Sequence, residues 1–203
     1  MSAAATLADG PRDRILLAAT DHVRRMGVAR LSVVHVARAV GMTHANIYRY
    51  FPSKAALVEE VGTDWLRGVE QRLGDITQAP DPAYDKLERF LTLLARTYEE
   101  KARADPAVFG ILAETTAISR ERHERRVRDL LGRIIEEGVA TRAFASGDVR
   151  RSEQLVLDVM HRFIDPSSVL RAVSSEPARP SSWESRRERA TRLLVRGLNH
   201  QRD

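Results

Sequence analysis

Four consecutive residues, Thr43, His44, Ala45 and Asn46, bring together a hydroxyl, an imidazole, a methyl and a carboxamide. The Asn46 carboxamide can both donate to and accept from the edge of an adenine, and the Ala45 methyl can touch the methyl of a thymine. If a helix begins here, the Thr43 hydroxyl and the free amides beside it can bind a phosphate. This order of residue types predicts contact with a DNA major groove, with His44, Ala45 and Asn46 facing base edges.

These side chains can reach a groove only if short helices hold them, and the surrounding sequence predicts two. Ser32 can cap the first helix and Thr43 the second, because a side-chain oxygen can accept a hydrogen bond from an unpaired amide at a helix start. Gly41 between them can end the first helix at a positive φ. Ala37 allows the two backbones to approach, and Ile47 can fill the angle between them. The pattern is that of a helix-turn-helix, whose second helix enters the major groove.

A longer run of residues surrounds this motif at fixed spacing: Gly41, Met42, Thr43, Ile47, Tyr48, Tyr50, Phe51, Ser53, Lys54 and Leu57, preceded by Ile15, Ala18, Ala19, Gly27 and Leu31-Ser32-Val33. Over the first third of the chain, this run resembles the DNA-binding domain of TetR-like transcriptional regulators. Val34 and His35 depart from the resemblance, since the family usually has charged or polar residues there.

The resemblance implies an all-α fold with two domains. It implies a three-helix DNA-binding domain over residues 11–71, with its helix-turn-helix at about 32–51. A long helix would join this domain to a helical effector-binding and dimerisation domain over 72–203. Residues 1–10 lack the basic start and apolar run of a signal peptide, and we expect them to form a disordered tail of a cytoplasmic protein.

The resemblance also adds phosphate contacts to the predicted DNA surface. It implies that Tyr48, Tyr50 and Lys54 hold the DNA backbone, although the two tyrosines could instead belong to the core. Ser32 is included among the DNA contacts at the start of the first motif helix. Arg49 could face a base, a phosphate or solvent.

The distribution of charge agrees with a polyanionic partner. The net charge is +5, and residues 10–54 hold eight Lys or Arg against two acidic residues, a net charge of +6. The other residues hold 25 basic and 26 acidic side chains, a net charge of −1. Basic charge confined to one unit favours nucleic-acid binding over the alternative of a solvated, arginine-rich surface.

Apolar residues recur at helical spacing along the rest of the chain, and no alternating run predicts a β-strand. The pattern predicts about nine helices, with a linker at 74–82 and a Ser- and Pro-rich loop at about 174–182. Asp105-Pro106 predicts a helix start, because Asp suits the cap and Pro the first helical position. The predicted helices include 12–26, a long helix at about 54–73, 120–140, 152–164 and 183–200.

Several classes of function are not supported. The chain has no cysteine, which excludes disulfides, thiolate metal sites and a cysteine nucleophile. No apolar run is long enough to span a membrane. The six histidines are scattered without metal-binding spacing, and no nucleophile and base can be paired. We therefore expect no enzyme activity, no metal and no cofactor.

The second domain supplies candidate residues for assembly and for a ligand. Helices 152–164 and 183–200 have wide apolar arcs, which predict a two-fold homodimer interface; the alternative is burial inside one subunit. The predicted interface residues are Leu155, Val159, Leu194 and Leu198. The predicted effector-binding residues are Tyr98, Phe109, Thr116, Asp158 and His161, with a fully packed core as the alternative. Asp158, His161 and Arg162 could instead form a local ion pair.

These residues favour one of three functions. The favoured one is a homodimeric repressor that binds a pseudo-palindromic duplex operator and is released by a small-molecule effector. The second is a ligand-independent DNA-binding regulator controlled by a protein partner or by its abundance. The third, an enzyme on a helical bundle, has no residue set to support it.

Overall fold

The computed structural model describes residues 10–114, 118–145, 147–175 and 180–198, and within these ranges it contains helices and no β-strand. The described residues form eleven α-helices and one 3-10 helix: α1 (Pro11–Met26), η2 (Val28–Arg30), α2 (Val33–Ala39), α3 (His44–Tyr50), α4 (Lys54–Thr63), α5 (Leu66–Gln78), α6 (Ala83–Ala104), α7 (Pro106–Glu114), α8 (Ile118–Ala140), α9 (Val149–Ile164), α10 (Pro166–Ser175) and α11 (Pro180–Leu198). The predicted all-α architecture is confirmed. The predicted tail falls on residues 1–9 and Gly10, of which residues 1–9 lie outside the described ranges.

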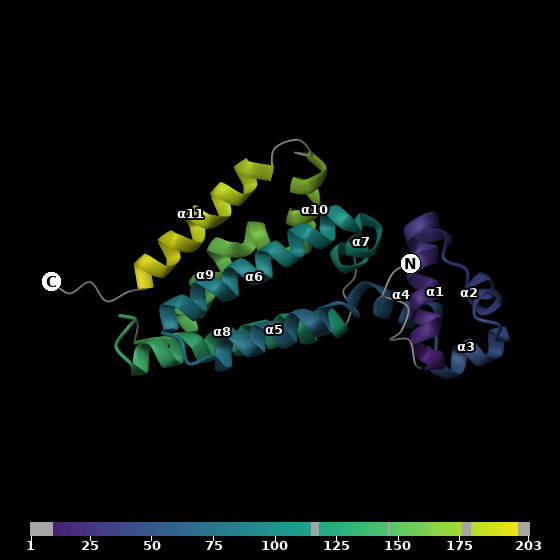
Figure 1. Ribbon diagram of the computed structural model, residues 1–203, viewed down its shortest axis with the longest axis horizontal. Helices are drawn as coiled ribbons and strands as arrows, with labels where there is room; N and C mark the ends of the chain where they lie inside the picture. Colours follow the sequence, from purple (N-terminus) through teal and green to yellow (C-terminus); the bar gives the residue numbers. More distant parts are fainter. Residues whose placement is uncertain (1–9, 115–117, 146, 176–179, 199–203) are drawn as a thin grey trace.

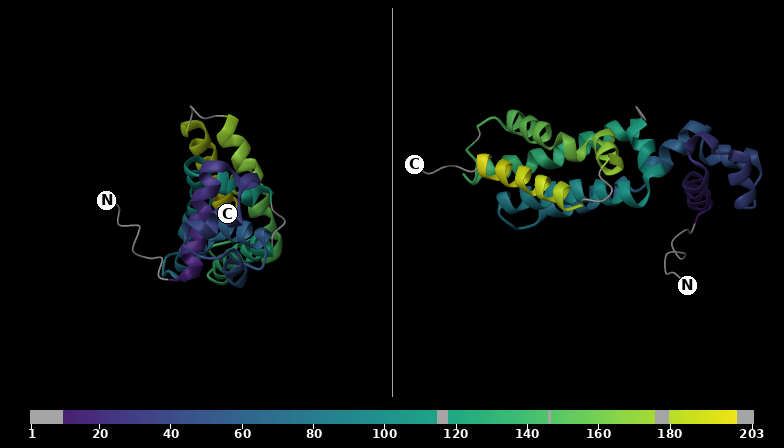
Figure 2. Two further views of the ribbon diagram at one scale, coloured as in Figure 1. Left: turned by 90° about the vertical axis from the view of Figure 1, so that its right-hand side faces the viewer. Right: turned by 90° about the horizontal axis from the view of Figure 1, so that it is seen from above.

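The helices are arranged in two units along an elongated molecule. Helices α1 to α4 form a small unit at one end, and α5 to α11 form a bundle that accounts for the rest (Figure 1). The view from above shows the same separation along the long axis (Figure 2, right). None of the helices in the described ranges has the length and apolarity needed to cross a membrane.

Three side-chain caps define the small unit. The hydroxyl oxygens of Ser32, Thr43 and Ser53 accept hydrogen bonds from the amides of His35, Asn46 and Ala56 at 3.4, 3.3 and 3.0 Å. Gly41 has a φ of 68°, as expected for the turn between α2 and α3. The predicted helix-turn-helix is therefore formed by α2 and α3.

Helix α7 belongs to both hydrophobic cores. Its Val108 and Ile111 pack in the core of the small unit, and its Phe109 and Leu112 pack in the core of the bundle. Gly62 of α4 permits this close packing, because a Cβ at that position would lie 2.5 Å from Cγ2 of Ile111. The two units are thus joined by a shared helix as well as by the chain.

The prediction of one long helix at 54–73 is wrong, because the chain turns at Asp64 and Trp65 between α4 and α5. The Trp65 indole Nε1 donates to the carbonyl of Gly62 at 2.8 Å, which occupies an acceptor that a continuous helix would use. Asp64 and Glu60 both form ion pairs with Arg67 across the turn.

Three further differences from the prediction concern α5, α10 and α11. Helix α5 continues to Gln78, since Leu73 and Ile76 are buried against the bundle, so the predicted linker shrinks to residues 79–82. Helix α10, which was not predicted, begins at Pro166, where the Asp165 carboxylate accepts from the amide of Ser168 at 2.8 Å. The described part of α11 begins at Pro180, before the predicted start.

Candidate functional site

Helix α3 presents nearly all of its side chains to solvent. Ile47 is its buried residue, and it packs with Val36 and Ala37 of α2. The predicted DNA contacts around it are exposed: Thr43, His44, Ala45, Asn46, Tyr48, Arg49, Tyr50 and Lys54. Ser32 is half-buried and caps α2, so its hydroxyl has a structural role. The predicted alternative that Tyr48 and Tyr50 belong to the core is wrong, since both rings are about 40% exposed (38% and 40%).

The exposed aromatic rings of α3 are positioned by their neighbours. The imidazole of His44 contacts the ring of Tyr48 edge-on, with 4.8 Å between centroids. This contact spans one helical turn and restricts the Tyr48 rotamer. The sequence had suggested a base contact for His44; the geometry gives it a supporting role for Tyr48 as well.

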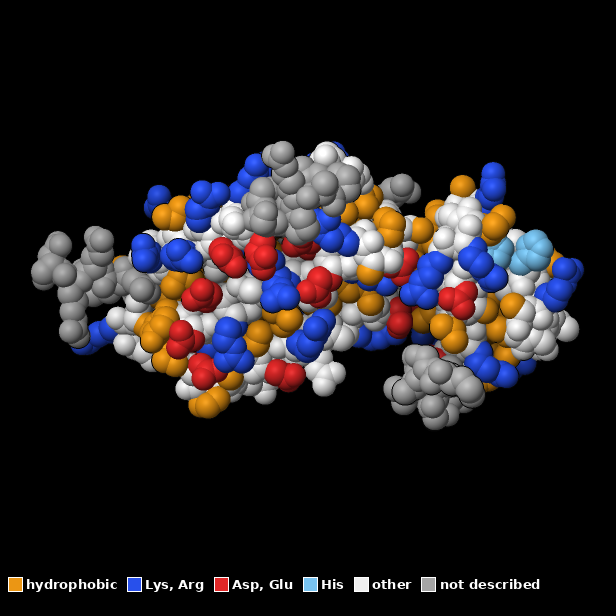
Figure 3. Space-filling view, turned by 45° about the horizontal axis from the view of Figure 1, so that its top comes forward, with side chains coloured by type: hydrophobic (Ala, Val, Ile, Leu, Met, Phe, Trp, Pro, Cys, Tyr) orange, Lys and Arg blue, Asp and Glu red, His pale blue; other side chains and the backbone are white. Residues whose placement is uncertain are grey.

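Basic side chains surround this end of the molecule. In the space-filling view, Lys and Arg side chains lie around the small unit, whereas acidic and basic side chains alternate over the bundle (Figure 3). Arg38, Arg49 and Lys54 are exposed on or next to the two motif helices. Arg12 and Arg24 instead form ion pairs with Glu60 and Asp105. The basic residues therefore divide into a structural group and an exposed group beside α3.

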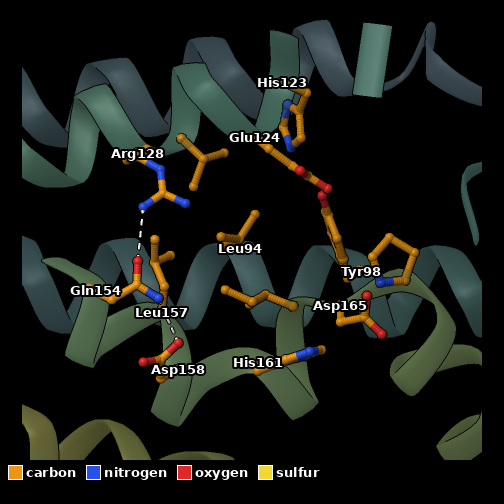
Figure 4. Close-up of a pocket in the computed structure, with 13 residues that line it drawn as sticks. Leu94, Tyr98, His123, Glu124, Arg128, Gln154, Leu157, Asp158, His161 and Asp165 are labelled. Atoms are coloured by element: carbon orange, nitrogen blue, oxygen red, sulfur yellow. Dashed lines mark hydrogen bonds between the residues drawn. The ribbon is translucent and has the colours of Figure 1, made fainter. Parts of the chain in front are cut away.

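A cavity of about 290 Å³ lies in the bundle between α6, α8 and α9. Figure 4 shows His123, Glu124 and Arg128 on α8 facing Gln154, Asp158 and His161 on α9, with Leu94 and Tyr98 of α6 between them. The full lining is Leu94, Tyr98, His123, Glu124, Val127, Arg128, Gln154, Leu157, Asp158, His161, Ile164, Asp165 and Pro166. The bundle thus has both a core of buried residues and this cavity at the edge of that core.

A chain of solvent-exposed polar contacts lies along one end of the cavity. Arg128 donates to Oε1 of Gln154 at 3.4 Å, and Nε2 of Gln154 donates to Asp158 at 2.8 Å (Figure 4). Arg128 also lies 3.6 Å from the carboxylate of Glu153. The positive charge of Arg128 is thus already balanced by an acidic neighbour.

The other end holds an aromatic and acidic group. Burial raises the pKa of Tyr98 well above its ordinary value, and the negative charge of Glu124 adds to the shift, so Tyr98 is a neutral phenol. Its ring stacks near His123, with 6.3 Å between centroids, and meets Phe109 edge-on at 5.7 Å. Arg120 pairs with Glu124 at 2.8 Å and lies 3.7 Å from Asp165.

His123 connects the cavity to α5. Its Nδ1 lies 2.7 Å from Oε1 of Glu70, and this hydrogen bond is the largest cause of the lowered pKa of Glu70. The imidazole is 2% exposed, and its Nε2 has no hydrogen-bond partner within the described ranges. A buried polar atom without a partner is costly, so this nitrogen is a candidate ligand contact.

The predicted effector residues are only partly brought together. Tyr98, Asp158 and His161 line the cavity, whereas Phe109 lies behind Tyr98 and does not line it. Thr116 lies outside the described residues. The predicted local ion pair does not form within the described ranges: Asp158 accepts from Gln154, and Arg162 lies over the Trp183 ring at 5.8 Å.

Sequence reasoning missed most of the polar lining. His123, Glu124 and Arg128 of α8 line the cavity but were not among the predicted effector-binding residues. Glu124 also forms an i,i+4 ion pair with Arg120. A useful signal was the helical spacing of His123 with Val127 and Leu130, which places the histidine on the buried stripe.

The predicted interface residues separate into two groups. Leu155 and Val159 of α9 are exposed, at 53% and 43%. Leu194 and Leu198, also predicted at the interface, are instead buried at 6% exposure each and pack in the core of their own subunit. Leu193 is the exposed leucine of α11, at 69%.

Each of the two units matches a known protein-family model. A model described as bacterial regulatory proteins of the tetR family matches residues 15–61, and one described as a tetracyclin repressor-like C-terminal domain matches residues 83–179. The chain belongs to the TetR family. The HTH-type transcriptional repressor KstR2 of Mycolicibacterium smegmatis is 24% identical over 197 residues, covering 92% of this chain and 90% of KstR2.

Solved structures share the TetR-family fold. A protein of unknown function from Rhodococcus sp. RHA1 has a TM-score of 0.71 at 18% identity, covering 97% of this chain and 100% of that chain. FadR from Bacillus subtilis in complex with stearoyl-CoA has a TM-score of 0.66 at 18% identity, covering 92% and 98%. The family makes this chain a DNA-binding transcriptional regulator, and the matched models are regulatory and not catalytic.

Proposed function

We propose that this protein is a homodimeric repressor that leaves its operator when a small ligand enters the cavity between α6, α8 and α9. The proposal is supported by the presence of two sites in one chain: the exposed helix α3 with basic side chains beside it, and a cavity whose Tyr98 contacts the shared helix α7. The description of KstR2 as a repressor supports the sign of regulation. The complex of FadR with stearoyl-CoA supports a ligand in this fold.

We propose that α3 reads the operator through its first turn. His44, Ala45 and Asn46 would face base edges, and Thr43 would meet a phosphate with its hydroxyl proton while its oxygen caps the helix. Tyr48, Tyr50, Arg49 and Lys54 would hold the backbone on either side. Their common exposure around buried Ile47 supports this docking.

Two copies are needed to present two recognition helices to a pseudo-palindromic site. Leu155 and Val159 on α9, together with Leu193 on α11, give an exposed apolar surface on the bundle. We propose that this surface, which we call the α9–α11 face, pairs with its copy around a two-fold axis. Leu194 and Leu198 support it from beneath, as part of the core.

Coupling between cavity and DNA would pass through α7. Tyr98 lines the cavity and contacts Phe109 of α7, while Val108 and Ile111 on the opposite face of α7 pack against the small unit. A ligand that prefers one position of Tyr98 therefore biases the position of α1 and α4. It weakens DNA binding only by its difference in affinity between the two states, typically about 1–3 kcal/mol.

The test measures ligand affinity with and without saturating operator. Reciprocity requires the operator to weaken ligand binding by the same factor as the ligand weakens operator binding. Equal affinities would contradict release and favour a ligand-independent regulator, controlled by a protein partner or by abundance. Gly62→Ala should change the factor by which operator weakens ligand binding, because its Cβ would lie 2.5 Å from Cγ2 of Ile111. Gly68→Ala should leave the factor unchanged, because the space around Gly68 is open.

A further inference from the structure

The proton on His123 is fixed by its neighbour. Glu70 presents a carboxylate, which can only accept, at 2.7 Å from Nδ1 of His123. A lowered pKa keeps this carboxylate ionised, with the hydrogen bond from His123 as the largest cause. Nδ1 of His123 therefore carries the proton, and in the neutral imidazole Nε2 is an acceptor.

This acceptor has no hydrogen bond of its own. Nε2 of His123 is buried without a partner among the described residues, although the side chain lines the cavity. Figure 4 shows the ring extending from α8 toward Tyr98 and the middle of the cavity. An unmet buried acceptor selects for a ligand that donates.

The groups around His123 add more acceptors than donors. The carboxylate of Glu124 lies on the same wall, and Asp165 lies across from it. Arg120 pairs with both carboxylates, so one of the two negative charges remains unbalanced at this end. The field there favours a neutral or cationic ligand over an anion.

The opposite end of the cavity has no unpaired positive charge among its described lining residues to bind an anion. Arg128 is the lining side chain that carries a full positive charge, and it already lies near Glu153 and donates to Gln154. The cavity volume of about 290 Å³ lies just below the usual range for ligand sites, roughly 300–1,000 Å³. A single ring with one polar group suits this size.

We propose that the cavity takes a compact organic ligand that directs a hydroxyl or ammonium donor at Nε2 of His123, and that it discriminates against anions of the same size. The inference rests on the proposed function, because it assigns a ligand chemistry to the effector site. Glu70 acts as a positioning residue: it holds the acceptor form of His123 without touching the ligand.

The experiment compares three one-ring probes on the full-length protein without DNA: benzyl alcohol, benzylamine in its cationic form, and benzoate. Calorimetric or ligand-observed titration at pH 7.5 should show both donors binding at least about tenfold tighter than benzoate, the factor expected for one unmet buried acceptor. The order of the first two separates a hydroxyl ligand from an ammonium ligand.

Variants of His123 and Glu70 test whether Nε2 of His123 accepts the hydrogen bond from the ligand. His123→Phe keeps a ring and removes the acceptor, and it should abolish the preference for donors while benzoate affinity stays unchanged. Glu70→Gln should reduce the preference by severalfold, because the glutamine amide can donate to Nδ1 and let Nε2 carry the proton. His22→Phe is the matched control, since His22 also has a buried unpartnered nitrogen but lies on α1, away from the cavity.

Three results would overturn the assignment: benzoate binding as tightly as the donors, an unchanged preference in His123→Phe, or no saturable binding of any probe. If a donor probe binds with the expected preference but leaves operator affinity unchanged, the proposed release by ligand is contradicted. The proposed ligand chemistry is not contradicted by that result.

Discussion

Helix α3 buries Ile47 and exposes its remaining side chains, whereas the cavity between α6, α8, α9 and the start of α10 is lined by both buried and exposed side chains. The α3 surface comes from about a dozen consecutive residues and is basic. The cavity wall spans residues 94 to 166 and is rich in acceptors. A surface for a long polymer can be read from a local pattern, but a cavity depends on how distant helices pack.

The largest expected effect is a difference in stability between substitutions at two adjacent leucines of α11, Leu194 and Leu193. Leu194→Glu places a charge in the bundle core and should lower the free energy of unfolding by about 3–5 kcal/mol. Leu193→Glu, on the exposed side, should change subunit stability by less than about 0.5 kcal/mol. Urea unfolding followed by circular dichroism measures both.

The exposed Leu193 also allows a test of whether the α9–α11 face forms the dimer interface. Leu193→Glu combined with Val159→Glu should yield folded monomers in light scattering and weaken operator binding. If Leu194→Glu proved as stable as wild type, the packing of α11 described above would be incorrect.

The next effect concerns base reading by α3. Asn46→Ala should cost about 1–3 kcal/mol on the operator, because it removes a base contact, and much less on a scrambled duplex of equal length. Fluorescence anisotropy with both duplexes measures the ratio. An equal loss on the two duplexes would mean that Asn46 contacts the backbone and does not read sequence.

A junction ion pair tests how the two regions are held together. Burial alone would raise the pKa of Asp105, but hydrogen bonds from Lys101 and Arg24 outweigh it and hold the pKa below its ordinary value. A lowered folded-state pKa stabilises the protein above about pH 4, and this contribution is lost as the pH falls through the folded pKa.

Asp105→Asn should therefore lower the free energy of unfolding by about 1–2 kcal/mol at pH 7, a figure reduced because Arg24 is half exposed. The difference from wild type should shrink below pH 4. Asp21→Asn removes the exposed partner of the same arginine and should have an effect of at most about 0.5 kcal/mol. Equal effects of the two variants would show that burial of Asp105 is unimportant.

The smallest expected effect is a change in how strongly DNA affinity depends on salt concentration. Lys54→Ala should weaken binding to all duplexes alike and reduce the dependence of log affinity on log salt by about one unit. Arg96→Ala, an exposed basic residue on α6 paired with Glu100, should leave that slope unchanged. A Lys54→Ala slope equal to wild type would contradict the docking of α3.

The helix-turn-helix could be predicted because its determinants are local. Ser32, Gly41 and Thr43 act within one or two turns, and the structure places each as its residue type requires. The turn at Asp64 and Trp65 could not be predicted in this way. It depends on the Trp65 indole bond and on Ile111, which lies about fifty positions away.

Helix α10 shows a local signal that was passed over. Asp165-Pro166 repeats the Asp-Pro start that predicted α7 at Asp105-Pro106, yet the short apolar pattern of Val169 and Leu170 did not stand out among serines. The cavity lining had no such signal. Glu124 and Arg128 look like solvated charges until α9 is placed opposite them.

The two-core membership of α7 has a consequence for synthesis on the ribosome. The small unit occupies residues 11–63, but Val108 and Ile111, which complete its core, are made some fifty residues later. A nascent chain that ends before α7 leaves Val61 and Leu57 without part of their packing. We therefore expect the small unit to reach its full packing only after α7 has been synthesised.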